Sequence, residues 1–217
     1  IYAMLAHPQV RAFNYQSLKY IIYATAPMTS EKLKEAIAIF GSIMAQTYGQ
    51  AESPMLCTFL SPQDHDVVGN PSLERRLQSC GRPTVFTPVE IMDDEGNLLG
   101  PEQAGEIVTR GNLVMKGYYN NPEATEQAST FGWHHTGDVG LKDADGFVYI
   151  VDRKRDMIIS GGFNLYPSEI EQVIWSHPSV QDCAVIGVPD EKWGEAVKAV
   201  VELKTGESVS PDEIMSF

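Results

Sequence analysis

Apolar positions follow a helical period most clearly in residues 29–41. In this stretch Leu33, Ile37 and Phe40 fall on one face of a helix, and polar residues occupy the positions between them. A Thr-Ser pair can cap the first turn, and Gly41 can end the helix. The pattern therefore predicts one amphipathic helix here, packed on its apolar face.

Apolar runs on both sides of this helix predict strands at residues 18–24 and 42–48. The order strand, helix, strand is typical of a parallel α/β unit. From about residue 62 the pattern changes to short β-prone runs between turn clusters such as residues 93–97, which predicts antiparallel β structure. These runs are residues 84–92, 105–110 and 147–151.

The pattern changes again after the basic cluster at residues 153–155. A short apolar run predicts a strand at residues 157–160, followed by a Gly-Gly turn and a helix that begins near Tyr166. Ser168 and Glu171 have the spacing of a capping box at the start of that helix. The last predicted elements are strands at residues 181–188 and 196–203 and a helix that starts at Ser210.

Together these elements predict an α+β protein with a boundary near residue 153. We interpret residues 1–152 as part of one large domain, in which an α/β strip (1–61) is followed by an antiparallel, β-barrel-like subdomain (62–152). We interpret residues 153–217 as a small, mobile α+β domain. Because the last predicted helix starts just before the sequence stops, we expect the chain to be a fragment of a longer protein.

Composition narrows the functional classes. The chain has 16 Lys and Arg against 29 Asp and Glu, a net charge of −13, which argues against a nucleic-acid or acidic-membrane binder. Hydrophobic residues make up 43%, enough for a packed core, and no apolar run approaches the roughly 18 residues of a membrane-spanning helix. The start has no signal-peptide pattern, and the three cysteines are widely spaced without a CxxC pair. These features favour a cytoplasmic protein with reduced thiols.

Two carboxylates stand in segments that could carry chemistry, and each also has a structural interpretation. Glu52 follows a predicted parallel strand, where open α/β sheets bind ligands, so it is either a candidate metal ligand or a solvated loop residue. Asp138 could accept two hydrogen bonds from a ribose or simply belong to a Gly-Asp turn. The adjacent His134 and His135 point apart and have no nearby Cys or His, which argues against zinc.

Two further segments are equally open to a structural interpretation. The basic cluster at residues 153–155 is either a solvated stretch or, at a domain boundary, a hinge or phosphate contact. Gly161 and Gly162 could admit a ligand against bare backbone, or they could form a hairpin turn.

Five blocks of sequence are more informative in their common order and spacing than any one alone. They are residues 24–28 (Ala-Thr-Ala-Pro-Met), 48–52 (Tyr-Gly-Gln-Ala-Glu), 117–125 (Gly-Tyr-Tyr-Asn-Asn-Pro-Glu-Ala-Thr), 132–138 (Gly-Trp-His-His-Thr-Gly-Asp) and 152–171. In this arrangement the chain resembles the AMP-forming acyl-CoA synthetases of the adenylate-forming superfamily. The Gly-Gly-Phe-Asn-Leu-Tyr-Pro run in the last block resembles the fatty-acid and aromatic-acid CoA ligase branch.

The resemblance implies that a carboxylic acid is joined to the α-phosphate of ATP, and that CoA then displaces AMP. It implies ATP/AMP, Mg²⁺ and coenzyme A as cofactors, and a small-molecule carboxylic acid and CoA as partners. It places the adenine against Thr25, Ala26, Pro27 and Tyr48, the α-phosphate near Ala51, the ribose on Asp138 and Arg153, and Mg²⁺ on Glu52.

The same resemblance implies roles outside the nucleotide site. Arg155 matches the hinge between the domains, where the family usually has Asp or Lys. Gly161 and Gly162 match the loop beside the pantetheine arm of CoA during thioester formation. Gly49 matches a wall of the acyl pocket, and its small size predicts an acyl group larger than acetyl.

Two departures from the family pattern limit these expectations. The family usually has Thr at the position of Ala51, where a hydroxyl donates to the α-phosphate, so we expect slower adenylation. No segment matches the family's phosphate loop or its late lysine, so we expect this chain alone to be inactive. Two alternatives stay open: an enzyme that loads acyl-AMP onto a carrier protein, and a non-catalytic nucleotide-binding relative, which Ala51 favours.

Overall fold

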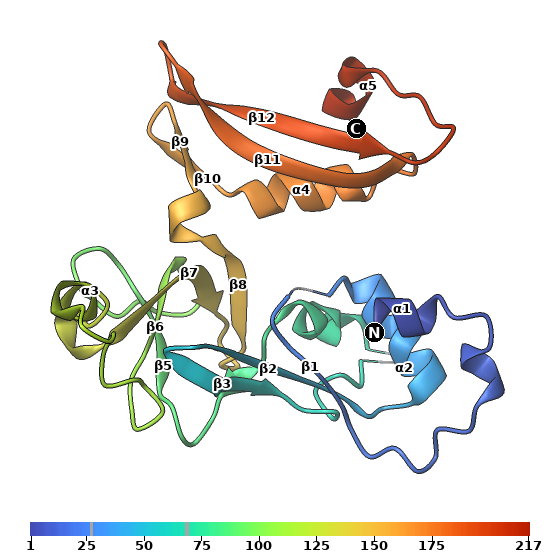
Figure 1. The fold of residues 1–217 in the computed structure, drawn as a ribbon, viewed down its shortest axis with the longest axis horizontal. Coiled ribbons are helices and arrows are strands. Elements are labelled where there is room, and N and C mark those ends of the chain that lie inside the picture. The colour runs from blue at the N-terminus through green and yellow to red at the C-terminus, as the bar shows by residue number, and fades with distance from the viewer. Residues whose placement is uncertain (27, 68–69) are drawn as a thin grey trace. The chain divides into compact units, whose positions relative to one another are not determined.

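The computed structural model describes residues 1–26, 28–67 and 70–217, which divide into two compact units (Figure 1). Unit 1 comprises residues Ile1–Thr136 and Gly140–Ile150. Unit 2 comprises Gly137–Val139 and Val151–Phe217. The division of the chain into the domains 1–152 and 153–217, with their functional roles, stays a prediction.

The first sheet of unit 1 has the strand order β1-β2-β3-β4. Strand β1 (Ile21–Tyr23) is parallel to β2 (Met44–Gln50), and helix α2 (Ser30–Phe40) connects them, which confirms the predicted strand-helix-strand unit. The sheet then continues with antiparallel strands β3 (Ser53–Leu60) and β4 (Arg82–Pro83). The hydrophobic pattern did not predict β3, which begins with a Ser-Pro pair more typical of a loop.

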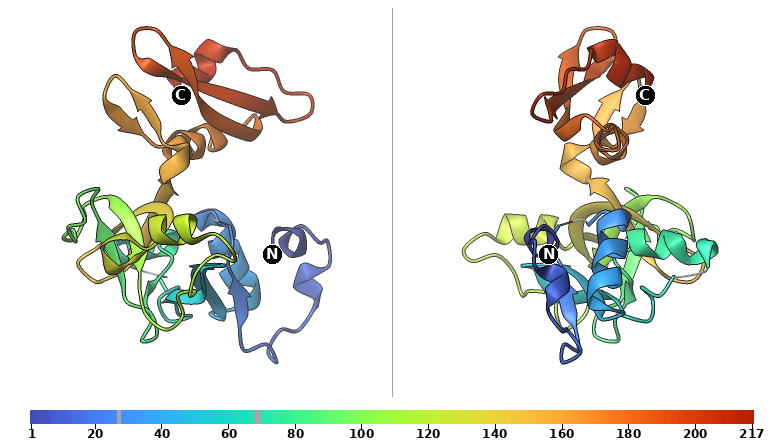
Figure 2. Two further views of the ribbon diagram at one scale, coloured as in Figure 1. Left: turned by 60° about the vertical axis from the view of Figure 1, so that its left-hand side comes forward. Right: turned by 90° about the vertical axis from the view of Figure 1, so that its right-hand side faces the viewer.

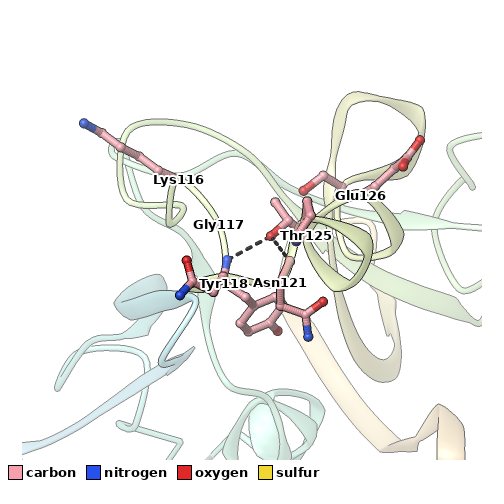
Figure 3. Close-up of a pocket in the computed structure, with 9 residues that line it drawn as sticks. Lys116, Gly117, Tyr118, Asn121, Thr125 and Glu126 are labelled. Carbon is pink, nitrogen blue, oxygen red and sulfur yellow. Dashed lines mark hydrogen bonds between the residues drawn. The ribbon is translucent and has the colours of Figure 1, made fainter.

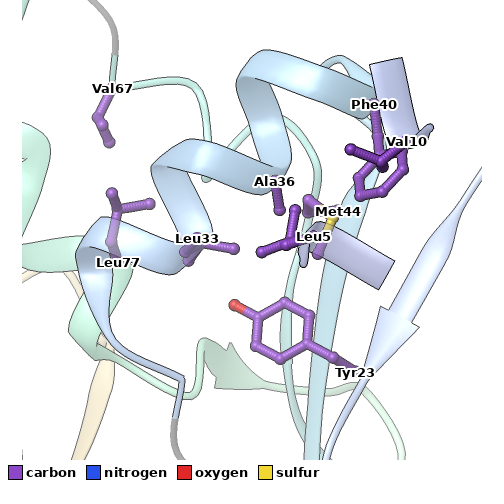
Figure 4. Close-up of a cluster of buried hydrophobic side chains, with 9 residues drawn as sticks. All are labelled: Leu5, Val10, Tyr23, Leu33, Ala36, Phe40, Met44, Val67 and Leu77. Carbon is purple, nitrogen blue, oxygen red and sulfur yellow. The ribbon is translucent and has the colours of Figure 1, made fainter. Parts of the chain in front are cut away.

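Helix α2 forms where the sequence predicts it, because its capping residues and its apolar positions indicate the same segment. The Thr29 side chain accepts a hydrogen bond from the Lys32 backbone N–H at 3.4 Å, and Gly41 ends the helix at a φ of 87°. Its buried face meets the short helix α1 (Tyr2–Leu5) and the first sheet in one core (Figure 4). That core consists of Leu5, Val10, Tyr23, Leu33, Ala36, Phe40, Met44, Val67 and Leu77.

The second sheet has the order β5-β6-β7-β8, and β5 and β6 are antiparallel as predicted. Its buried residues pack with Cys57 of β3 and with Cys80, so this sheet shares a core with the first one. Among the described residues both sheets are open and no barrel closes, so the barrel-like expectation is replaced by antiparallel sheets. The elements are β5 (Val89–Met92), β6 (Gly105–Thr109), α3 (Pro122–Gln127), β7 (His134–Lys142) and β8 (Val148–Arg153).

Unit 2 contains a sheet of order β10-β9-β12-β11 with helix α4 packed against β11 (Figure 2). The helix and the sheet bury a small core of Ile158, Ile174, Val180, Cys183 and Val185. The elements are β9 (Ile158–Ser160), β10 (Phe163–Leu165), α4 (Pro167–Trp175), β11 (Val180–Asp190), β12 (Gly194–Leu203) and α5 (Pro211–Ser216).

The predicted capping box of α4 is wrong. Asp152, rather than Ser168, caps the helix, because its carboxylate accepts a hydrogen bond from the Ser168 backbone N–H at 2.9 Å. The Ser168 hydroxyl instead donates to the carbonyl oxygen of Val151. Glu171 accepts a hydrogen bond from the Val185 backbone N–H at 2.8 Å, so it supports the sheet and not the helix start. The spacing of Ser168 and Glu171 fits a capping box, but both side chains form hydrogen bonds with residues outside the helix instead.

The three cysteines, Cys57, Cys80 and Cys183, are buried and form no disulfide within the described chain. Burial raises the pKa of the Cys183 thiol to about 11, which makes this thiol a weak nucleophile. In the part of the chain that the structure describes, no helix is long and apolar enough to cross a membrane.

We expect Leu33→Ala to lower the free energy of unfolding by about 2–5 kcal/mol, because it leaves a cavity in the core of unit 1 where Leu33 is fully buried. Lys34→Ala on the same helix is the control, since its ion pair with Glu74 is exposed and such pairs contribute less than about 1 kcal/mol. Urea unfolding would compare the two variants, and equal losses of stability would contradict the assignment of this core.

Candidate functional site

The parallel pairing of β1 with β2 brings two of the sequence blocks to one edge of the sheet. Tyr23 is in register with Gln46, so the residues that follow β1 lie toward the same end of the sheet as the last residues of β2. Thr25 and Ala26 follow β1 and are exposed, and Thr25 adopts a φ of 72° that turns the chain. Pro27, predicted to contact the adenine, lies outside the described residues.

The segment 48–52 is not a loop beyond the strand, as the sequence suggested, but the end of β2 and a tight turn into β3. Tyr48 is half-buried and packs against the core shared by the two sheets. Ala51 is exposed at the turn, and Glu52 follows it half-buried. The missed strand β3 explains the error, because a hairpin places these residues on the sheet itself.

Gly49 has a backbone reason to be glycine. The register of β2 and β3 shifts between Tyr48 and Gln50, which indicates an irregularity at this point of the pair. A Cβ atom on Gly49 would lie 2.4 Å from the Met55 nitrogen and 2.7 Å from the Ser53 carbonyl oxygen, both of them backbone atoms. Any side chain is therefore excluded here, and the small size of Gly49 does not by itself indicate the length of an acyl pocket.

Glu52 is held at two points by one loop. Its Oε1 accepts a hydrogen bond from the Tyr118 hydroxyl at 2.8 Å, and its backbone carbonyl accepts one from the Met115 N–H at 2.7 Å. Oε2 has no hydrogen-bond partner among the described residues. The bond to Glu52, more than burial, raises the pKa of the Tyr118 phenol, so Tyr118 stays the donor.

The loop that carries Tyr118 borders a depression of about 580 Å³ (Figure 3). Thr125 is at its centre, where its hydroxyl accepts a hydrogen bond from the Tyr118 N–H at 2.9 Å and donates one to the Asn121 carbonyl at 2.8 Å. The depression is lined by Lys116, Gly117, Tyr118, Asn120, Asn121, Pro122, Thr125, Glu126 and Ser129.

The two adjacent histidines at the start of β7 have different environments. His134 is buried, and its Nδ1 donates to the Ala128 carbonyl at 3.2 Å, which leaves Nε2 as an acceptor without a hydrogen-bond partner in the described chain. Burial lowers the pKa of His134, which favours the neutral form of its ring. His135 contacts Glu106 at 3.1 Å instead. The neighbouring Thr136 carbonyl accepts a hydrogen bond from the Gln50 side chain at 3.2 Å, which ties β7 to the β2–β3 hairpin.

The chemistry of Glu52 fits a magnesium ion that is brought in with a nucleotide. Within the described residues no cluster of three or more His, Cys, Asp or Glu side chains could hold a metal alone. Mg²⁺ bound with nucleotides typically uses one or two carboxylates and takes its other ligands from phosphates and water. One carboxylate with an unengaged oxygen has the chemistry that such a partial site requires.

Unit 2 brings Asp138 and Arg153 together. The Arg153 Nε lies 3.7 Å from the Asp138 Oδ1, although the residues belong to different strands. Asp138 is 16% exposed and Arg153 is 59% exposed, so the carboxylate is largely buried while the guanidinium is accessible to solvent. This is a paired acid and base that could share the hydroxyls of one ligand.

The other predicted residues of unit 2 lie on a short helical turn and a hairpin. Arg155 lies in the turn Lys154–Asp156, largely exposed, with its Nε 3.4 Å from Asp156. Gly161 and Gly162 form the two-residue turn between β9 and β10, with φ values of 57° and 84°. Of the two interpretations of the Gly-Gly pair, the structure supports the hairpin, and the role beside CoA stays a prediction.

Sequence reasoning assigned no role to Tyr118, Met115 or Thr125. The block 117–125 forms part of the family resemblance, but the contact of Tyr118 with Glu52 spans 66 positions and leaves no local signal in the sequence. Only the fold brings the two blocks together.

Two protein-family models match the chain, one in its first part and one near its end. A family model described as AMP-binding enzyme matches residues 1–119, and one described as AMP-binding enzyme C-terminal domain matches residues 169–217. A medium/long-chain-fatty-acid–CoA ligase of Mycobacterium tuberculosis is 46% identical over 205 residues, which cover 94% of this chain and 35% of the relative.

Two solved structures have the same fold. Amide bond synthetase McbA from Marinactinospora thermotolerans matches with a TM-score of 0.87 at 35% identity, over 99% of this chain and 43% of that one. The o-succinylbenzoate CoA synthetase of Bacillus subtilis, in complex with the acyl-adenylate intermediate OSB-AMP, matches with a TM-score of 0.81 at 36% identity, over 93% of this chain and 39% of that one. The chain thus spans less than half the length of these proteins.

We expect Gly49→Ala to destabilise the protein by about 1–3 kcal/mol, because the new methyl group would overlap backbone atoms of β3. Gly100→Ala is the matched control, since its Cβ would meet nothing closer than the Gln103 Oε1 at 3.6 Å. Thermal unfolding would measure both. A stable Gly49→Ala variant with only an altered preference for acid length would show that the pocket, and not the backbone, selects glycine.

Proposed function

Because the chain belongs to the family of AMP-binding enzymes, we propose that the protein that contains it activates a carboxylic acid with MgATP and passes the acyl group to CoA. The observation that supports this most is Glu52, a carboxylate held at the carboxyl edge of a parallel strand pair with one oxygen unengaged. That position suits a ligand of a nucleotide-bound cation.

In the proposed first step, a carboxylate oxygen of the acid attacks the α-phosphorus of ATP, and pyrophosphate leaves. Thr25 and Ala26 would lie against the edge of the adenine, and Tyr48 would cover its face. Glu52 would hold Mg²⁺, which when bound neutralises charge on the phosphates. The chain itself supplies orientation and charge, and no nucleophilic side chain is required.

In the proposed second step, the thiolate of CoA attacks the acyl carbonyl carbon, and AMP leaves with the electrons of the broken C–O bond. Asp138 would accept hydrogen bonds from the ribose hydroxyls, with Arg153 beside it. Arg155 would act as the hinge, and the Gly161-Gly162 turn would let the pantetheine arm pass close to the backbone.

The acyl acceptor is the less constrained half of this proposal. The relative from Mycobacterium tuberculosis is named a CoA ligase, whereas one of the two structural neighbours is named an amide bond synthetase. A second candidate function, acyl activation followed by transfer to an acceptor other than CoA, follows from that neighbour. A carrier protein is one acceptor of this kind.

The experiment that tests the proposal uses the full-length protein and a panel of carboxylic acids. We expect ATP–pyrophosphate exchange with at least one acid in the absence of CoA, and AMP release that requires CoA. Glu52→Gln should reduce the exchange by roughly 100-fold, because the loss of the carboxylate charge weakens metal-assisted charge neutralisation. Glu31→Gln, an exposed carboxylate on α2, is the control. Absence of exchange with every acid would reject the proposal, and exchange without CoA-dependent release would favour the second candidate.

We expect Ala51→Thr in the full-length protein to raise the rate of adenylation, by up to roughly tenfold, because a hydroxyl could donate to the charged α-phosphate. Ala51→Val adds a side chain of similar size without the hydroxyl, so it separates the hydrogen bond from bulk. Single-turnover formation of acyl-AMP would measure the effect. An equal rate for the Thr variant and the unchanged protein would count against this role, and equal gains for Thr and Val would point to packing.

A further inference from the structure

We propose that Tyr118 is a positioning residue for Glu52, and that the segment 115–125, a loop with the first turn of α3, is a clamp that presents one carboxylate oxygen of Glu52 to the metal ion. This inference rests on the proposed function, because it assigns how the metal-binding carboxylate is oriented.

The contact between Tyr118 and Glu52 divides the carboxylate into two unlike oxygens. Oε1 accepts the phenolic hydrogen at 2.8 Å, while Oε2 has no partner among the described residues. A side chain of Glu has several rotatable bonds, so without this bond the carboxylate would sample many orientations. The hydrogen bond from the Tyr118 hydroxyl restricts the orientation of the carboxylate before a metal ion binds, and it leaves Oε2 available to that ion.

The backbone of Glu52 is fixed by the same loop. The Met115 N–H donates to the Glu52 carbonyl at 2.7 Å, three positions before the tyrosine in sequence. Two bonds from one loop, one to the backbone and one to the side-chain tip, determine where the carboxylate points. A single surface hydrogen bond could not do this, because the side chain would still rotate about it.

The loop is in turn closed on itself by Thr125. Its hydroxyl bridges the Tyr118 N–H and the Asn121 carbonyl, so the backbone on both sides of the turn is tied to one side chain (Figure 3). Gly117 adopts a φ of 153°, and a Cβ there would lie 2.8 Å from the Thr125 methyl group. A glycine at position 117 therefore leaves room for the Thr125 side chain that accepts the Tyr118 N–H.

Helix α3 completes the clamp. The Asn121 side chain accepts a hydrogen bond from the Ala124 N–H at 3.1 Å, and Pro122 occupies the first turn. This start of the helix holds Thr125 in place. Tyr119, the neighbour of Tyr118 in sequence, is 94% exposed and takes no part in these hydrogen bonds.

The clamp acts on the metal more than on the nucleotide base. Tyr118→Phe removes only the hydroxyl, so Glu52 keeps its charge but loses its fixed orientation. We expect the affinity for Mn²⁺, in the presence of a non-hydrolysable ATP analogue, to fall about fivefold or more in the full-length protein. The affinity for AMP in EDTA should stay unchanged, because no metal takes part in that binding.

Electron paramagnetic resonance of Mn²⁺ would measure the metal affinity, and calorimetry would measure AMP binding. Tyr119→Phe is the matched control, since it removes a phenol from the neighbouring exposed position. Thr125→Val should weaken metal binding like Tyr118→Phe, and Thr125→Ser should restore it, because serine keeps the bridging hydroxyl. Thermal unfolding of each variant would identify a general loss of structure.

The outcomes separate the inference from the function on which it rests. If the unchanged protein binds Mn²⁺ with the analogue and Tyr118→Phe binds it equally well, the inference is overturned and the proposed function stands. Equal losses in metal and AMP binding would overturn it as well, because they indicate a structural role only. Should the unchanged protein fail to bind Mn²⁺ with the analogue, both the inference and the metal role of Glu52 are overturned.

Discussion

The close approach of β2 to β3 at Gly49 is the constraint on which the candidate site depends. Because Gly49 has no side chain, the β3 backbone can lie close to β2. The tight turn that joins the two strands then carries Ala51 and Glu52 at the carboxyl edge of the parallel pair. The parallel pairing of β1 with β2 brings Thr25 and Ala26, which follow β1, to this edge. A glycine that seemed to concern the substrate is thus first a requirement of the sheet.

A carboxylate in such a turn can bind a metal ion well only if its orientation is fixed. In this fold a segment distant in sequence fixes the orientation of Glu52. The segment 115–125 bonds both the backbone and the side chain of Glu52 and is closed by Thr125 and α3. In unit 2 the pairing of Asp138 with Arg153 places an acceptor and a donor together in a similar way. The net charge of −13 is a property of the whole chain and does not describe these local contacts.

Local signals allowed part of this to be predicted. Helix α2 followed from its period, its threonine cap and its terminal glycine, all within a dozen positions. The capping box of α4 failed because Asp152 and Val185 offered tertiary partners that no spacing reveals. The pairing of Asp138 with Arg153 was expected only from a family resemblance, and the contact of Tyr118 with Glu52 was not expected at all. Contacts between blocks far apart in sequence depend on the fold, and local pattern carries no information about them.

The central claim is that Glu52 presents one oriented carboxylate oxygen to a nucleotide-bound metal. A crystal structure of the full-length protein with Mn²⁺ and a non-hydrolysable ATP analogue, recorded with anomalous scattering, tests it directly. The account predicts the manganese peak within bonding distance of the Glu52 Oε2, with the Tyr118 hydroxyl still on Oε1. A manganese peak held by other residues, or a Glu52 side chain turned away from the nucleotide, would contradict it.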